Sequence, residues 1–125
     1  MQIRLTKDFL LTEFNCNDGN QVPVSLQDNV KELALNLQVL RDKINEPIHI
    51  NSGYRSVLYN QKIGGVKNSQ HLQGKAADIT TKTYSPKQLA KIIEQLIADK
   101  KMKQGGLGVY PGFVHYDIRG TKSRW

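Results

Sequence analysis

Hydrophobic residues recur every three or four positions in two long segments of the chain. In SLQDNVKELALNLQVLRDKI the apolar side chains fall at positions 26, 30, 33, 37, 40 and 44, which is the spacing of one helix face. We expect a helix over about residues 26–44 with Ser25 as its N-cap. In SPKQLAKIIEQLIADKK, Ser85 is expected to cap a second helix and Pro86 to occupy its first turn. The apolar stripe of this second helix is Leu89, Ile92, Ile93, Leu96 and Ile97.

Shorter segments show the alternation that is typical of β-strands. PIHINSGYRS predicts a strand with Ile48 and Ile50 on one face and His49 on the other. KAADIT predicts a short buried strand in which Ala76, Asp78 and Thr80 share a face. GLGVYPGFVHYDIRG is typical of a hairpin with Pro-Gly at the centre of a type II turn.

Helical and strand segments interleave along the chain, without a repeat or a linker. The sequence therefore predicts an α+β fold, in which a small antiparallel sheet carries the functional site and packs against two main helices. We expect residues 1–125 to form a single domain.

The charge and composition of the chain indicate which partners are expected and exclude some kinds of site. The net charge of +7 favours anionic partners such as cell-wall polymers. Nucleic acid is not an expected partner, because the lysines are scattered and no zinc-finger, RNP or KH signature accompanies them. Cys16 is the only cysteine, which excludes an internal disulfide and a cysteine-based zinc site. No apolar run approaches the roughly 20 residues of a membrane helix, so no membrane span is expected.

Two histidines and an aspartate are candidates for a metal site. An aspartate on a buried strand is costly unless it is paired or bound to metal, and small residues around Asp78 allow other elements to approach it. His115 and Asp117 are two positions apart and therefore share a strand face. Together with His71 they can converge on zinc, whose catalytic sites use three N or O ligands and leave one position to water. His49 has no such neighbours and is expected to be an ordinary strand residue.

These motifs resemble those of the zinc D-Ala-D-Ala carboxypeptidase family of murein peptidases, particularly its small single-domain phage and bacterial forms. The family signature of Ser, any residue, His, six residues and Asp is matched by Ser69, His71 and Asp78, with Gly74 and Ala76 inside it. GLGVYPGFVHYDIRG resembles the downstream histidine block, and SGYRS resembles the arginine-bearing turn. FLLTEFNC and SRW resemble the ends of the small forms.

The resemblance implies a hedgehog/D-Ala-D-Ala peptidase-type fold, with His71, Asp78 and His115 as the ligands of one zinc ion per chain. It implies that Arg55 binds or polarises the substrate and that Ser69 contacts it. The expected activity is hydrolysis of peptide bonds in peptidoglycan stem or cross-link peptides, by a carboxypeptidase or an endopeptidase.

The general base is where the sequence departs from the family pattern. Many relatives carry an acid three residues before the last histidine, or a second histidine two residues from it. Here position 112 is glycine, and Asp117 stands two residues after His115. We name Asp117 as the base, while it could instead orient a ligand as a hydrogen-bond acceptor or itself bind the metal.

The expected setting is the bacterial cell wall, with peptidoglycan peptides as the partner. The start MQIRLTKDFLLTEF lacks the apolar core and cleavage site of a signal peptide, so we expect cytoplasmic synthesis followed by phage-type release, as a lysin, or delivery in a virion. The alternative function is a catalytically inactive, zinc-containing wall-binding or virion structural module. Nucleic-acid binding would leave the His/Asp spacing unexplained.

Overall fold

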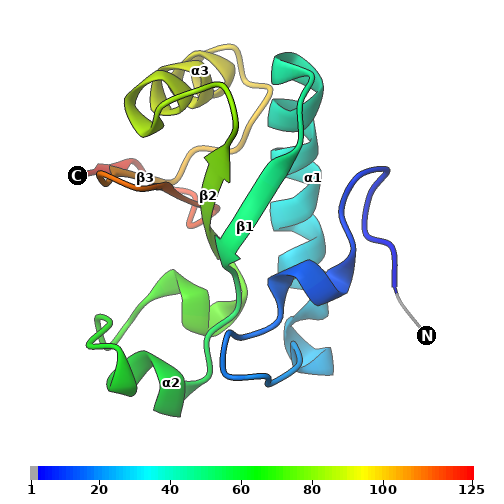
Figure 1. Ribbon diagram of the computed structural model, residues 1–125, viewed down its shortest axis with the longest axis vertical. Coiled ribbons are helices and arrows are strands. Elements are labelled where there is room, and N and C mark those ends of the chain that lie inside the picture. The colour runs from blue at the N-terminus through cyan, green and yellow to red at the C-terminus, as the bar shows by residue number, and fades with distance from the viewer. Residues whose placement is uncertain (1–2) are drawn as a thin grey trace.

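The computed structural model (Figure 1) describes residues 3–125. It has one five-stranded sheet of order β1-β2-β4-β3-β5. Its strands are β1 (Ile48–Ser52), β2 (Ala76–Thr81), β3 (Gly106–Val109), β4 (Val114–Asp117) and β5 (Ser123–Arg124). The α-helices are α1 (Gln27–Ile44), α2 (Val57–Lys62) and α3 (Pro86–Ala98), and short 3-10 turns lie at Leu11–Phe14, Val24–Leu26 and Gln70–Gln73. The predicted α+β class is confirmed. The sheet is mixed, because β5 pairs with β3 in parallel while the other pairs are antiparallel.

The two long helices α1 and α3 share one hydrophobic core with the sheet. In Figure 1, α1 runs beside β1, and α3 lies at the end of the molecule that β2 reaches. The core joins apolar side chains of both helices to one face of the strands: Val30, Leu33, Leu37, Leu40, Ile48, Ile50, Ala77, Ile79, Leu89, Ile93, Val114 and Tyr116. The helices therefore cover that face, and the polar positions of β2 and β4 lie on the other.

The helix starts differ in how well the sequence predicts them. Ser85 caps α3 as predicted, and its hydroxyl accepts a hydrogen bond from Gln88 in a reciprocal capping box. The prediction of Ser25 as the N-cap of α1 is wrong, because a 3-10 turn over Val24–Leu26 leads directly into the helix and Leu26 takes that position. Among residues 3–125, no helix has the length and apolar character that crossing a bilayer requires.

The register between β2 and β4 decides which side chains meet. Ile79 lies opposite Val114 on the core side of the sheet, and Asp78 lies opposite His115 on the other side. The same register places Ala76, a residue with almost no side chain, opposite Asp117. The antiparallel pairing of β3 with β4 confirms the predicted hairpin. The predicted type II turn is wrong, because Gly112 does not have the positive φ that this turn requires at its second central residue. A polar row along β2 and β4 is therefore built into the sheet.

Candidate metal centre

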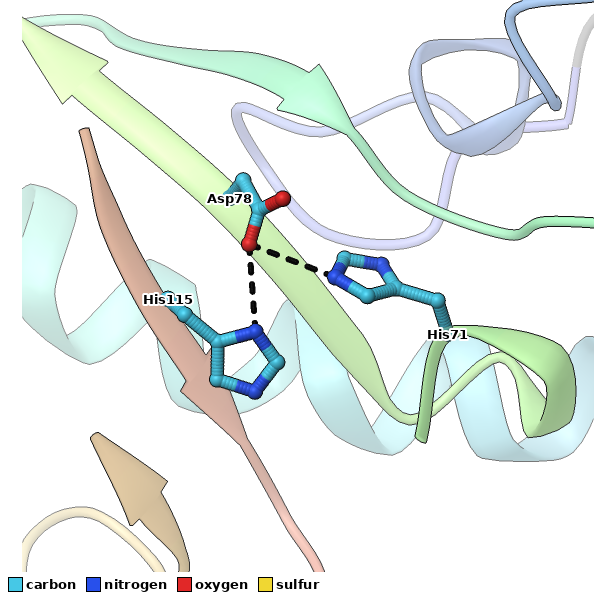
Figure 2. Close-up of side chains that lie close together, drawn as sticks. All are labelled: His71, Asp78 and His115. Carbon is cyan, nitrogen blue, oxygen red and sulfur yellow. Dashed lines mark hydrogen bonds and ion pairs between the residues drawn. The ribbon is translucent and has the colours of Figure 1, made fainter. Parts of the chain in front are cut away.

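Three buried side chains from separate elements meet on the polar face of the sheet (Figure 2). His71 comes from the 3-10 turn Gln70–Gln73, Asp78 from β2 and His115 from β4. One Oδ atom of Asp78 lies 3.2 Å from His71 Nε2 and 3.1 Å from His115 Nδ1. One ligand atom from each residue lies within 4.8 Å of the others, so the three can hold one metal ion.

A backbone carbonyl fixes the orientation of His71. Its Nδ1 lies 2.7 Å from the carbonyl oxygen of Gly53. Because a carbonyl oxygen only accepts, Nδ1 donates its proton to Gly53, which leaves Nε2, the nitrogen that faces Asp78, available to bind a metal ion. The turn itself is held by Ser69, whose hydroxyl accepts from the His71 backbone N–H, and it ends at Gly74 with a φ of 68°. The glycine of the motif thus terminates the turn that carries His71, in the left-handed region that glycine adopts most readily.

A carboxylate fixes the orientation of His115. Its Nε2 lies 2.7 Å from Asp117 Oδ2, so the N–H on Nε2 points to Asp117 and Nδ1 faces Asp78. Asp117 is fully buried. Its two oxygens also accept from the backbone N–H groups of Gly106 and Arg119 and, at 2.9 and 2.7 Å, from the Arg119 guanidinium. Asp117 therefore lies behind His115 with both oxygens already engaged.

The two carboxylate oxygens of Asp78 have different partners, because Arg55 binds one of them. Its guanidinium lies 3.2 Å from Oδ2 of Asp78, while Oδ1 faces the two histidines. Further hydrogen bonds to Ser52 and Asn60 hold the guanidinium in place. Asp78 thus has one oxygen for a metal ion and one for a fixed cation.

The electrostatics of the cluster favour ionised carboxylates. Burial acts to raise the pKa of Asp78, but hydrogen bonds with His115 and His71 hold it well below its ordinary value. The pKa of Asp117 is likewise held well below its ordinary value, because hydrogen bonds from His115, Arg119 and the Gly106 N–H outweigh burial. Burial acts to lower the pKa of His115, whereas Asp117 and Asp78 raise it above its ordinary value.

The cluster forms the floor of an open cleft of about 450 Å³. Arg55 and Ser69, which the sequence predicts to contact substrate, both line it. Among the described residues that line this cleft, Asp78 is the only carboxylate. Three aromatic residues line the cleft: the stacked rings of Tyr110 and Phe113 lie 4.5 Å apart, and the Trp125 ring is centred 4.9 Å from that of His115. The loop after α2 also lines it, with the apolar side chains of Ile63 and Val66 and the glycines between them.

Several residues of the site are absent from the sequence-based candidates. Arg119 stands two positions after Asp117, and the same alternation that grouped His115 with Asp117 could have found it. The Gly53 carbonyl leaves no side-chain signature in the sequence. His49 lies exposed on β1, paired with Thr80 and outside the metal cluster, as expected of an ordinary strand residue.

The donor set fits zinc. Two imidazole nitrogens and one carboxylate oxygen are a ligand set that catalytic zinc uses, and it leaves a coordination position for water or substrate. Each histidine donates its other ring N–H to a fixed acceptor, Gly53 or Asp117, which is the arrangement that holds metal-binding histidines in one tautomer.

Comparison with known proteins identifies the family. The family model of peptidase M15 matches residues 7–117. The chain belongs to the peptidase M15 family. It is 35% identical, over 78 residues, to the zinc D-Ala-D-Ala carboxypeptidase of Streptomyces albus G, a match that covers 58% of this chain and 31% of that protein. It is 27% identical, over 117 residues, to the probable peptidoglycan L,D-endopeptidase MepK of Haemophilus influenzae, covering 88% of this chain and 58% of MepK.

The M15 chain spans less than two thirds of the length of either relative. The predicted family is confirmed over nearly all of the chain. The buried His–Asp–His cluster, together with a relative that is a zinc enzyme, supports one zinc ion per chain as the cofactor.

Gly53 offers a test of how the histidine is held. A Cβ at this position would lie 2.8 Å from Phe14 Cα and 2.9 Å from the Phe14 carbonyl oxygen, and neither backbone atom can rotate away. Gly53→Ala is therefore expected to lower the free energy of unfolding by about 1–3 kcal/mol and to weaken zinc binding by displacing the carbonyl that orients His71. Urea unfolding and zinc titration measure the two effects. Gly112→Ala is the control, because an added methyl there meets nothing within 4 Å; equal losses in both variants would contradict the prediction.

Proposed function

We propose that residues 1–125 act as one zinc-dependent peptidase domain that hydrolyses peptide bonds in the stem or cross-link peptides of peptidoglycan. The observation that carries the proposal is a buried His–Asp–His cluster at the floor of an open cleft, in a chain of a peptidase family. The names of both relatives support the substrate class, since one is a D-Ala-D-Ala carboxypeptidase and the other a probable peptidoglycan endopeptidase. The site of action that follows is the cell wall.

His71, Asp78 and His115 are the proposed zinc ligands, through Nε2, Oδ1 and Nδ1 respectively. A zinc ion bound there supplies a Lewis acid that polarises the scissile carbonyl and lowers the pKa of its water to about 7. Gly53 and Asp117 hold the two imidazoles in the required tautomers, and Arg55 keeps the second oxygen of Asp78 occupied. The ligand geometry is thus built before the metal arrives, which favours tight binding.

Arg55 and Ser69 are the proposed substrate contacts. Arg55 lines the cleft beside Asp78, and its remaining N–H groups can bind a peptide carboxylate or stabilise the developing oxyanion. Ser69 accepts one hydrogen bond from the His71 backbone and retains its own hydroxyl proton to donate. Hydrolysis adds one water across the amide, with the hydroxyl bonding to the carbonyl carbon and the proton passing to the leaving amine.

Asp117 is proposed to orient His115. The sequence names it as the general base and leaves the orienting role open; its contacts favour the orienting role. Both of its oxygens accept hydrogen bonds from His115, Arg119 and Gly106, and it is absent from the residues that line the cleft. A base must reach the proton it removes within one hydrogen bond or through one water, and His115 stands between Asp117 and the cleft.

Digestion of purified muropeptides by the zinc-loaded protein tests the proposal. We expect new products whose masses differ from the substrate by the addition of water, and the fragments identify the bond that is cut. Removal of zinc by a chelator is expected to abolish them and readdition to restore them. If the muropeptides stay intact although the protein holds one zinc per chain, the proposed peptidase activity is wrong. That result would support the alternative function, an inactive zinc-containing wall-binding module.

A further inference from the structure

A second hollow adjoins the catalytic cleft and has no part in the proposed metal chemistry. It has a volume of about 670 Å³ and lies between α3 and the strands β3 and β5. We call it the α3 groove and define it by its lining residues: Lys87, Ala90, Lys91, Glu94, Gln95, Ala98, Leu107, Val109, Lys122, Arg124 and Trp125. Trp125 also lines the cleft, so the two hollows share one wall.

The α3 groove is cationic. Its carboxylate, Glu94, is fully engaged with Arg124, whose Nε and Nη2 lie 2.7 and 2.9 Å from the two carboxylate oxygens. The side-chain ammonium groups of Lys87, Lys91 and Lys122 form no ion pair and no hydrogen bond with any residue in the 3–125 range. Three ammonium groups without a direct ion-pair partner therefore line a groove whose remaining lining is partly aliphatic, and such a surface is complementary to an anionic group on a partly apolar chain.

Trp125 lies between the cleft and the α3 groove, and hydrogen bonds fix both its backbone and its side chain. Its backbone pairs with β3, because Val109 N–H donates to the Trp125 carbonyl at 2.9 Å and Trp125 N–H donates to the Leu107 carbonyl at 3.2 Å. Its indole N–H donates to the Tyr110 hydroxyl at 2.7 Å, and the Arg119 guanidinium carbon lies 5.5 Å from the ring centre. The indole is still about half exposed, so a chain that leaves the cleft can cross it into the groove.

We propose that the α3 groove binds free carboxylates of the peptidoglycan peptide next to the bond that is cut. The inference rests on the proposed peptidase function. It adds that the preferred substrate is a polymeric peptide network that bears free carboxylates, rather than a short free peptide. Lysine ammonium groups bind carboxylates as point charges, and the aliphatic lining residues Ala90, Ala98, Leu107 and Val109 can contact the apolar parts of the same peptides. Because Trp125 joins the groove to the cleft, one substrate can occupy both.

The test compares two substrates and two triple variants. The groove variant is Lys87→Gln, Lys91→Gln, Lys122→Gln. The control variant is Lys31→Gln, Lys43→Gln, Lys82→Gln, which removes the same total charge outside the groove. One substrate is isolated sacculi, and the other is a short N-acylated peptide ending in D-Ala-D-Ala with uncharged side chains. We expect the groove variant to lose roughly tenfold in kcat/KM on sacculi, and the control variant and the short peptide to show changes below about twofold.

A further comparison identifies the anion. Sacculi whose carboxyl groups have been converted to amides should be cut equally well by wild type and the groove variant, because the charge that the lysines recognise is gone. If the difference between them persists on amidated sacculi, the groove binds phosphate polymers of the wall and the proposal is overturned. Equal losses in both triple variants, or equal losses on both substrates, also overturn it. If wild type cuts neither substrate, the proposed peptidase function fails first, and the two failures are therefore distinguishable.

Discussion

His71→Ala and His115→Ala are each expected to lose zinc and hydrolysis together. Each removes one of three protein ligands, and two remaining ligands are too few for a catalytic zinc site. Zinc content should fall from about one to below about 0.1 per chain after dialysis, because the fixed tautomers at Gly53 and Asp117 cannot compensate for a missing nitrogen. Without the Lewis acid, several kcal/mol of transition-state stabilisation disappear, so turnover should fall by at least about 10³-fold. Metal analysis and muropeptide digestion measure the two losses on the same sample.

His49→Ala is the matched control for these variants. His49 is an exposed histidine of β1 that lies outside the cluster, so its replacement should leave zinc content and turnover unchanged. If either cluster variant keeps one zinc per chain as His49→Ala does, the ligand set is wrong. Circular dichroism of the metal-free proteins separates loss of zinc from loss of fold, since α1 and α3 dominate the helical signal.

Local patterns were sufficient to predict the strands that carry Asp78 and His115 and the two long helices that pack against the sheet, but not the 3-10 turn that carries His71. The three-and-four spacing from Leu33 to Leu40 predicts α1, and the capping serine and proline at positions 85 and 86 predict the start of α3. The alternation in VHYD places His115 and Asp117 on one face of β4, where the structure has them. Each of these inferences needs only neighbours in sequence, because helix and strand periods are local properties.

The pairing that brings the ligands together could not be predicted in the same way. Asp78 meets His115 because β2 pairs with β4, across the intervening helix α3 and strand β3. A slip of one residue would turn Asp78 into the hydrophobic core, so the register depends on burying Ala77 and Ile79 against α1 and α3. The Gly53 carbonyl is a backbone acceptor reached through the turn after β1, and any residue type at position 53 carries a carbonyl. Tertiary contacts, which no short motif records, therefore supply the register that brings Asp78 to His115 and the carbonyl that orients His71.

Asp117→Asn distinguishes an orienting carboxylate from a general base. The five hydrogen bonds to Asp117 all come from donors, and an amide offers an NH₂ group where one oxygen now accepts. The variant should therefore be less stable by about 3 kcal/mol, because the buried amide and the Arg119 guanidinium are left imperfectly paired. It should also bind zinc about 10- to 100-fold more weakly, since His115 loses the acceptor that fixes its tautomer.

The decisive measurement is hydrolysis at saturating zinc, with zinc affinity determined separately by chelator competition. If Asp117 orients His115, excess zinc should restore turnover to within about tenfold of wild type, because the missing interaction acts on metal binding. Arg119→Gln should follow the same pattern with a smaller loss of affinity, since Arg119 holds Asp117 in place and touches no ligand directly. Asp99→Asn, a replacement at an exposed carboxylate, should change neither quantity. Normal zinc affinity in Asp117→Asn, combined with a loss of about 10² to 10⁴ in turnover that excess zinc does not restore, would assign Asp117 as the base and contradict the orienting role.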